Sequence, residues 1–217
     1  MADADGDGAF RLGILASHGG SNFQAIFDRC VSLEIPAQVG VVISNNSTSG
    51  AIERAETQDL PWAHLSSRTH PDPVALDRAI LGCLQQYKVD LVVLAGYMKK
   101  LGPDTLEAYK GRVINIHPAL LPAFGGQGMY GERVHQAVIA SGARVTGVTV
   151  HLVDGNYDSG PIIAQEVVKV LEDDTAESVA QRVLRVEHTL YPAVVRLFAE
   201  RRVTVSCGRV SIQQRDG

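Results

Sequence analysis

The nine-residue run "VDLVVLAGY" (Val89–Tyr97) places the strongest constraint on the fold, because it is apolar at nearly every position. A strand with one face in water alternates apolar and polar residues, whereas a strand covered on both faces does not. Upstream, apolar residues between Ser21 and Leu33 recur at helical spacing. The combination indicates a parallel sheet with helices packed above and below it.

The same alternation of apolar runs and amphipathic segments continues along the chain. We expect strands at residues 11–16, 38–45, 60–65, 89–97, 111–117, 144–153 and 161–170, and helices at 21–33, 50–58, 72–87, 103–109, 131–141 and 176–201. Only seven residues join the last two strands, which favours antiparallel pairing. The predicted fold is α/β, a mostly parallel, twisted, Rossmann-like sheet flanked by helices, with an antiparallel strand pair in the C-terminal half.

The sequence also predicts three local features of the fold. The helix at 72–87 is expected to turn Ala75, Ala79, Ile80, Cys83 and Leu84 inward. The last helix is expected to be interrupted near Pro192, since proline removes a helical hydrogen bond. The segment 202–212 is expected to form a terminal strand or a hairpin.

Composition limits the class of protein. With 217 residues and 45% hydrophobic side chains, the chain can bury a sizeable core, and we expect one domain at 10–217 after a flexible tail at 1–9. A formal net charge of -4 argues against a nucleic-acid partner, which calls for a basic face. Cys30, Cys83 and Cys207 lie too far apart for a C-x-x-C metal site. The start of the sequence lacks a signal-peptide pattern and no apolar run is long enough to span a membrane, so a cytoplasmic protein with no membrane partner is expected.

The turn "SHGGSN" (Ser17–Asn22) is the first candidate site. Glycines after a strand allow close approach of a ligand, and the following helix would direct its free N–H groups toward a phosphate. The turn lacks the spacing of the Walker A motif and of the dinucleotide fingerprint. A phosphate site and a purely structural turn both fit, and Ser21 or Asn22 also suits a helix cap.

The second candidate is the pair Asn115 and His117 in "INIHP". At a spacing of two, both side chains leave the same face of a strand, at the carboxyl end where open parallel sheets bind ligands. An amide can donate to a developing oxyanion, and an imidazole can exchange a proton near neutral pH. A core pair that holds a turn is the alternative.

The third candidate is the loop "VDGNYDSGPII" (Val153–Ile163), which carries Asp154 and Asp158. Aspartates in such loops usually cap turns. A carboxylate near His117 would instead raise the pKa of the imidazole and fix its orientation. His151 alternates with apolar residues and suits a core histidine as well as a cleft residue, while Glu187 on the last helix suits a solvated face.

Four motifs occur together and in order: "SHGGSN", "VVLAGYM", "INIHPALLP" and "VHLVDGNYDSGPII". In this combination the chain resembles the glycinamide ribonucleotide formyltransferases (phosphoribosylglycinamide formyltransferases), a family of folate-dependent one-carbon transferases of purine synthesis. The resemblance runs from about Arg11 to about Ala199. It implies a phosphate-binding N-terminal half, to about residue 110, and a folate-binding C-terminal half.

The resemblance also implies roles for individual residues, each by its place in a matching motif. Asn115, His117 and Asp158 match the catalytic Asn, His and Asp, and His151 matches a second histidine near them. Gly20, Ser21 and Asn22 match the phosphate-holding turn, and Glu187 matches an acid that contacts the ribonucleotide. The residues that match the folate pocket are Met98, Lys99, Lys100, Leu101, Asp154, Gly155, Asn156 and Tyr157. Lys99 departs from the family pattern, because many relatives have Arg there.

The implied reaction transfers a formyl group from 10-formyltetrahydrofolate, as co-substrate, to the primary amine of glycinamide ribonucleotide. His117 would need a raised pKa, supplied by Asp158, and no metal is required. Two alternatives remain open: hydrolysis of formyltetrahydrofolate, and a non-catalytic nucleotide-binding regulator. A homodimer is left open as well.

Overall fold

The computed structural model describes residues 8–206 and 208–214, so residues 1–7 of the expected tail lie outside the described part. The strands are β1 (Phe10–Ala16), β2 (Ala37–Ser44), β3 (Trp62–His64), β4 (Leu91–Leu94), β5 (Val113–His117), β6 (Val145–Leu152), β7 (Ile162–Lys169), β8 (Val203–Ser206) and β9 (Arg209–Ile212). The helices are α1 (Ser21–Val31), α2 (Gly50–Thr57), α3 (Pro73–Gln86), α4 (Pro103–Ala108), α5 (Glu132–Ser141) and α6 (Ala176–Ala199). Each predicted element is present, with ends displaced by a few residues.

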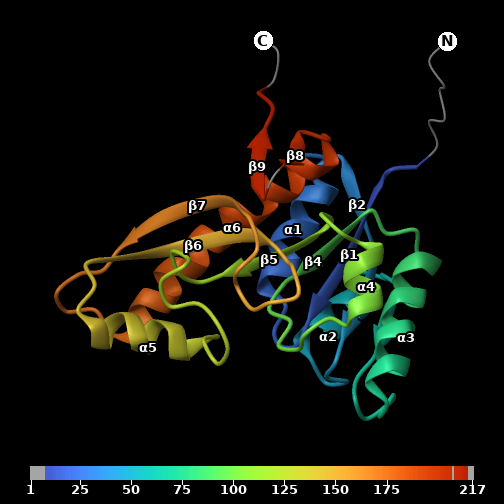
Figure 1. The fold of residues 1–217 in the computed structure, drawn as a ribbon, viewed down its shortest axis with the longest axis horizontal. Helices are drawn as coiled ribbons and strands as arrows, with labels where there is room; N and C mark the ends of the chain where they lie inside the picture. The colour runs from blue at the N-terminus through green and yellow to red at the C-terminus, as the bar shows by residue number, and fades with distance from the viewer. Residues whose placement is uncertain (1–7, 207, 215–217) are drawn as a thin grey trace.

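Seven strands form one sheet in the order β3-β2-β1-β4-β5-β6-β7 (Figure 1). The first five strands in this order, β3 to β5, run parallel to one another. Strand β6 runs antiparallel to β5 and to β7. The predicted α/β class, the parallel sheet and the antiparallel pair in the C-terminal half are therefore confirmed. The carboxyl ends of β1, β4 and β5 meet at one edge of the sheet, where the candidate residues were expected.

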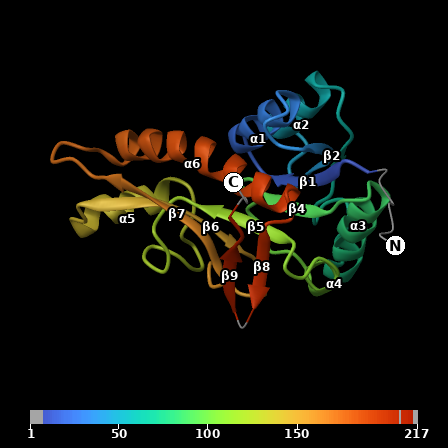
Figure 2. The same cartoon turned by 90° about the horizontal axis from the view of Figure 1, so that it is seen from above.

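Helices cover the sheet on both faces, as the apolar run in β4 required. Helices α1, α2 and α6 lie on one face and α3 and α4 on the other (Figure 2). Leu91 and Val93 face the first layer, while Val92 and Leu94 face the second. All four side chains are at most 6% exposed. Burial on alternating sides explains why every position of this strand is apolar.

Side-chain caps mark where three of the helices begin. Ser49 accepts a hydrogen bond from the Ile52 N–H at the start of α2. Asp72 caps α3 ahead of Pro73, which needs no N–H partner at the first helical position. Thr175 and Ser178 cap α6 reciprocally.

Two local predictions are wrong. Helix α6 runs unbroken through Pro192, because the buried side chains of Tyr191, Val194 and Val195 pack around that position and outweigh the lost hydrogen bond. In α3, Ala75 is exposed and Asp77 is buried instead. The Asp77 carboxylate accepts the Asp104 N–H at 2.8 Å at the start of α4, so burial serves a helix cap here.

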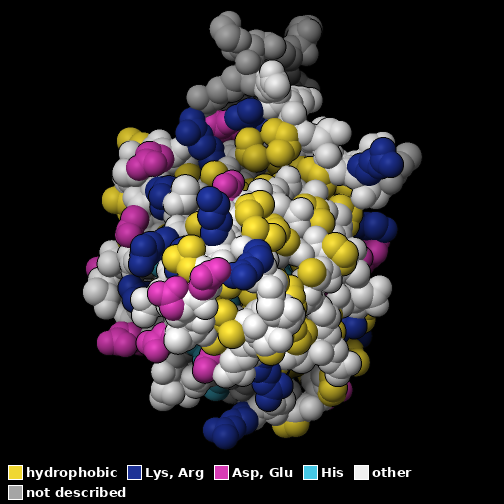
Figure 3. All heavy atoms as spheres, turned by 90° about the vertical axis from the view of Figure 1, so that its left-hand side faces the viewer, with side chains coloured by type: hydrophobic (Ala, Val, Ile, Leu, Met, Phe, Trp, Pro, Cys, Tyr) yellow, Lys and Arg dark blue, Asp and Glu magenta, His cyan; other side chains and the backbone are white. Residues whose placement is uncertain are grey.

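The terminal segment forms the hairpin β8–β9, the second of its two expected forms. In the part of the chain that the structure describes, no helix has the length and apolarity needed to cross a membrane. At the left-hand end of Figure 1, Lys and Arg side chains are interspersed with acidic and hydrophobic ones (Figure 3).

Candidate active site

Two adjoining hollows open at the carboxyl edge of the sheet. The larger, called the cleft here, has a volume of about 520 Å³ and is lined by Asn22, Gly96, Tyr97, Met98, Lys99, Asn115, Ile116, His117, Pro118, Gly126, Gln127, Gly128, Met129, Tyr130, Gly131, Tyr157, Asp158 and Glu187. The smaller, the side pocket, has a volume of about 70 Å³ and is lined by Leu94, Tyr97, Lys99, Lys100, Leu101, Leu106, Asn115, His151, Val153, Asp154, Gly155, Asn156, Tyr157 and Asp158. Five residues line both hollows: Tyr97, Lys99, Asn115, Tyr157 and Asp158. The expected catalytic residues Asn115 and Asp158 thus lie where the two hollows meet.

His117 ends strand β5 and is only 3% exposed. Its Nε2 lies 2.8 Å from the backbone oxygen of Phe124. A carbonyl can only accept, so Nε2 carries the proton. The other ring nitrogen, Nδ1, lies 3.6 Å from Oδ2 of Asp158. The structure therefore brings His117 and Asp158 together, as the sequence analysis expected.

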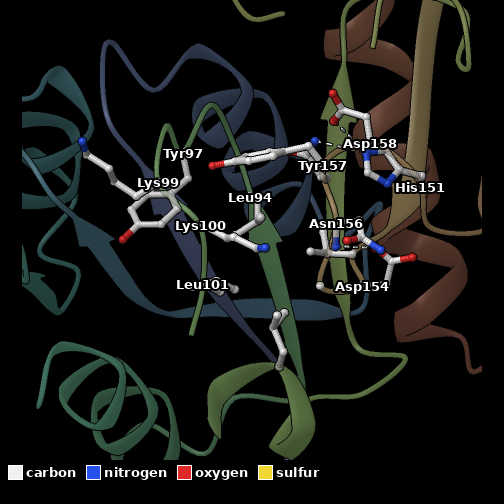
Figure 4. A pocket seen from close by; sticks show the side chains of 14 residues that line it. Leu94, Tyr97, Lys99, Lys100, Leu101, His151, Asp154, Asn156, Tyr157 and Asp158 are labelled. Atoms are coloured by element: carbon white, nitrogen blue, oxygen red, sulfur yellow. Dashed lines mark hydrogen bonds and ion pairs between the residues drawn. The ribbon is translucent and has the colours of Figure 1, made fainter. Parts of the chain in front are cut away.

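Asp158 lies between two imidazoles. Its Oδ1 is 3.6 Å from Nε2 of His151, and its Oδ2 accepts the Gly126 N–H at 2.9 Å. Figure 4 shows the Asp158 and His151 side chains pointing toward each other, from the β6–β7 loop and from β6. Asp158 adopts φ 54°, in the left-handed region that few residues other than glycine, asparagine and aspartate occupy.

The expected rise in the pKa of His117 is not found. Burial lowers the pKa of His117 below 6.5, and the opposing attractions of Asp158 and of the Phe124 carbonyl do not overcome it. His151 nearby adds to the lowering. Asp158 acts in the expected direction, but sequence spacing could not reveal how deeply the imidazole is buried. In the structure as it stands, His117 is mostly neutral at neutral pH.

At Asp158 the attraction of neighbouring groups outweighs the effect of burial on the pKa. Burial raises the pKa of its carboxyl, but the His151 side chain, the Gly126 N–H and His117 together bring the pKa below 3.8. Asp158 is therefore an anion over the working range of most enzymes. This places a negative charge beside two histidines in the site.

His151 is 2% exposed, and each of its ring nitrogens has a hydrogen-bond partner that fixes the orientation of the ring. Its Nδ1 lies 2.8 Å from the Leu152 carbonyl oxygen, so Nδ1 carries the proton. Its Nε2 then accepts from the Asn115 amide at 3.2 Å. Asn115 keeps a second N–H free for a ligand.

Glu187 reaches the cleft from α6 rather than facing solvent. It is 8% exposed and accepts a hydrogen bond from the Asn22 amide at 2.6 Å. Burial raises the pKa of its carboxyl above 4.5, and the bond from Asn22 offsets only part of that rise. The structure joins two predicted substrate residues that lie far apart in sequence.

The predicted phosphate turn precedes α1. Gly20 has φ 72°, and a Cβ atom there would lie 2.9 Å from the Ala51 Cα, so the position requires glycine. No side chain caps α1. Asn22 lines the cleft, whereas Gly20 and Ser21 are not among its lining residues.

Most of the residues that match the folate pocket gather at the side pocket. Lys100, Leu101, Asp154, Gly155 and Asn156 line it, while Met98 lines the cleft alone. Tyr157 is 51% exposed, and the Lys100 ammonium lies 5.8 Å from its ring centroid. In Figure 4 the side chains from the end of β4 face those from the β6–β7 loop across this pocket.

Three contributions to the site were not predicted from the sequence. Tyr97 lines both hollows, and its place at the end of the apolar run Val89–Tyr97 was the available signal. Residues 126–131 form one wall of the cleft. The Phe124 carbonyl, which orients His117, is a backbone group that no sequence signal identifies. Within residues 8–206 and 208–214, no cluster of three or more His, Cys, Asp or Glu side chains is arranged to hold a metal ion.

Fold and site together define a Rossmann-like α/β protein with an Asn, a His and an Asp at the carboxyl edge of its sheet. The chain belongs to the formyl transferase family, whose model matches residues 10–195.

Individual relatives agree with this family. The chloroplastic phosphoribosylglycinamide formyltransferase of Vigna unguiculata is 43% identical over 89% of this chain, and the match spans 62% of that protein. The phosphoribosylglycinamide formyltransferase of Bacillus subtilis is 38% identical over 86% of this chain and 93% of its own length. The crystal structure of glycinamide ribonucleotide transformylase 1 from Symbiobacterium toebii superposes with a TM-score of 0.90 at 41% identity, covering 98% of this chain and 99% of that one. The chain thus spans less than two thirds of the Vigna protein and nearly the whole of the two bacterial ones.

Proposed function

We propose that this chain transfers the formyl group of 10-formyltetrahydrofolate to the primary amine of glycinamide ribonucleotide, in purine synthesis in the cytoplasm. One observation carries the proposal: Asp158 lies 3.6 Å from the imidazoles of both His117 and His151, beside Asn115, where the two hollows meet. The names of the relatives support the choice of substrates.

The cleft would hold the ribonucleotide. The N–H groups at Gly20, Ser21 and Asn22 would bind its phosphate at the start of α1. Glu187, buried in the cleft wall, would accept hydrogen bonds from its polar groups. This assigns the phosphate end to the N-terminal half of a single domain at 10–217.

The side pocket would hold the pterin end of the folate, between Met98–Leu101 on one side and Asp154–Tyr157 on the other. Tyr157, which is 51% exposed and lines this pocket, would lie against the bound ring system. Lys99 and Lys100 supply positive charge beside an anionic co-substrate.

The reaction would start when the neutral amine attacks the formyl carbon. The carbonyl electrons move to oxygen, and the new C–N bond gives a tetrahedral intermediate with a negative oxygen and a positive nitrogen. Asn115 would donate its free N–H to that oxygen. Negative charge on the oxygen favours protonated His117, and so does Asp158, so the imidazole would take up the proton that the attacking nitrogen gives up and would pass it on to N10 of the folate.

The intermediate then collapses. The attacking nitrogen gives up a proton, N10 of the folate takes one up, the C–N10 bond breaks and the carbonyl re-forms. The products are the formamide and tetrahydrofolate. Asp158, held as an anion between two histidines, would stabilise the positive charge while the proton moves. No metal enters these steps.

The test is the release of tetrahydrofolate from 10-formyltetrahydrofolate, measured with and without glycinamide ribonucleotide. Release that requires the ribonucleotide supports transfer. Equal release without it identifies a hydrolase, and tight ribonucleotide binding without release identifies a regulator. Either of these last two results overturns the proposal.

A further inference from the structure

A group of buried and half-buried hydrogen bonds lies next to His117 on the neighbouring strands. Thr149 of β6 pairs with His117 in the β5–β6 ladder and is fully buried. Its hydroxyl donates to the Ala119 carbonyl at 2.7 Å and accepts from the Leu121 N–H at 3.0 Å. The Gln165 amide of β7 donates to the same hydroxyl at 2.9 Å and to the Leu121 carbonyl at 3.0 Å. One hydroxyl proton and both lone pairs of Thr149 are therefore in use.

These bonds hold the chain just before the two backbone groups that orient the active site. The Phe124 carbonyl, three residues after Leu121, accepts the Nε2–H of His117 at 2.8 Å. The Gly126 N–H donates to Asp158 at 2.9 Å. Neither Thr149 nor Gln165 is among the residues that line the cleft or the side pocket.

The held segment also packs closely on β6. A Cβ atom on Gly147 would come within 2.6 Å of the Leu120 side chain. The apolar contact brings the segment down onto the strand, and the Thr149 and Gln165 bonds are directional and fix its position along the strand.

We propose that Thr149 and Gln165 are positioning residues for the formyl transfer: through Ala119 and Leu121 they set the place of the Phe124 carbonyl, and so the proton position on His117. The kinetic part rests on the proposed function. The tautomer of His117 does not, and it can be measured without any substrate.

The chain offers a matched control. Thr146 lies on the same strand and is 1% exposed, but its hydroxyl has no hydrogen-bond partner among the residues that the structure describes. Thr149→Val and Thr146→Val therefore make the same chemical change at two buried sites of β6, and only the first removes bonds. Thr149→Ser keeps the hydroxyl and serves as the rescue variant.

The first measurement is the ¹⁵N spectrum of the histidine rings, with the His117 signals assigned from a His117→Gln variant. In the wild type and in Thr146→Val we expect a proton on Nε2 of His117. In folded Thr149→Val we expect the signals to move toward a mixture of the two tautomers, and in Thr149→Ser to return. An unchanged His117 spectrum in Thr149→Val overturns the proposal, whatever the enzyme's activity.

The second measurement is steady-state kinetics of tetrahydrofolate release. We expect kcat of Thr149→Val to fall on the order of 10-fold, with both KM values within about 3-fold of wild type, because the reacting groups are misplaced while the binding surfaces remain. Thr149→Ser and Thr146→Val should stay near wild type. A Thr149→Val kcat equal to that of Thr146→Val, or a loss that Thr149→Ser does not restore, overturns the proposal. A wild type that releases no tetrahydrofolate in response to the ribonucleotide instead sinks the proposed function alone.

If Thr149→Val does not fold, Gln165→Met removes two of the four bonds from a more exposed position. It should shift the His117 signals and kcat in the same direction by a smaller amount. No shift in either quantity then overturns the proposal.

Discussion

The cleft is lined by two carboxyl groups whose surroundings shift their pKa values in opposite directions. Glu187 receives one hydrogen bond, from the neutral amide of Asn22, and burial raises its pKa. Asp158 is also partly buried, yet two imidazoles and a backbone N–H bring its pKa below the ordinary value. Burial raises the pKa of both carboxyl groups, but Glu187 is the more deeply buried and has one neutral donor. Asp158 is half-buried and lies beside a backbone N–H and two imidazoles that attract its charge when they are protonated. One group suits the binding of neutral polar atoms, and the other suits the stabilisation of a cation.

The largest expected effect comes from removing the anion. Asp158→Asn keeps the shape and the left-handed backbone, but it takes away the charge beside His117 and His151. We expect turnover to fall on the order of 100-fold or more, measured as ribonucleotide-dependent tetrahydrofolate release. Asp173→Asn, which neutralises an exposed carboxylate in the β7–α6 loop, is the control and should stay near wild type. A folded Asp158→Asn protein with normal turnover would remove this residue from the mechanism.

The matching change at the second carboxyl group of the cleft is Glu187→Gln. Because the side chain sits in a neutral environment and a glutamine can still accept and donate hydrogen bonds, we expect a smaller loss, mainly a rise on the order of 10-fold in the KM for the ribonucleotide. The measurement is the same assay with the ribonucleotide varied. Equal losses of kcat in the two amide variants would mean that the two carboxyls do not differ in the way their surroundings indicate.

A third substitution tests the difference between the pKa values of Glu187 and Asp158 without kinetic measurements. Asn22→Ala removes the one donor that lowers the pKa of Glu187. The midpoint of the Glu187 titration, followed by carboxyl ¹³C NMR and assigned with Glu187→Gln, should move upward, while the Asp158 midpoint stays in place. The exposed substitution Gln136→Ala on α5 is the control. A downward shift of the Glu187 midpoint would contradict the assignment of causes given above.

The smallest effect concerns stability. His135 is 5% exposed, and within the described part of the chain its Nδ1 has no hydrogen-bond partner. Burial lowers the pKa of His135, and His117 adds to that lowering. The folded state therefore disfavours a proton that the unfolded chain accepts below about pH 6.5. The free energy of unfolding should fall between about pH 7.5 and about pH 5.5, and by less in His135→Leu.

Urea denaturation at the two pH values measures this difference. His70→Leu, which removes a histidine from the loop between β3 and α3, controls for the loss of one imidazole. If His135→Leu and wild type lose the same free energy on acidification, His135 does not contribute to the pH dependence.

The fold could be predicted from the sequence because its strongest signals are local. The buried run at β4 and the short link between β6 and β7 require no knowledge of distant contacts. Pro192 and Ala75 were misjudged because tertiary packing decided both: the buried neighbours of Pro192 keep α6 continuous, and α4 draws Asp77 inward as a cap. Hydrophobic periodicity does not include contacts with residues that lie far away in the sequence.

The site could be predicted only in part. Motifs named Asn115, His117 and Asp158, and the structure places them together. The protonation of His117 was misjudged, because its burial and its bond to a backbone carbonyl depend on the folded path of residues 119–126. Thr149 was not predicted for a similar reason, since the sequence does not show which hydrogen bonds a threonine in a strand makes.

The left-handed backbone of Asp158 affects how the protein could be made more stable. A side chain in that conformation costs roughly 1–2 kcal/mol relative to glycine, which adopts it freely. Selection for heat resistance in the laboratory would therefore tend to bring in glycine and remove the carboxylate that lies beside His117 and His151, so such a search should hold position 158 constant.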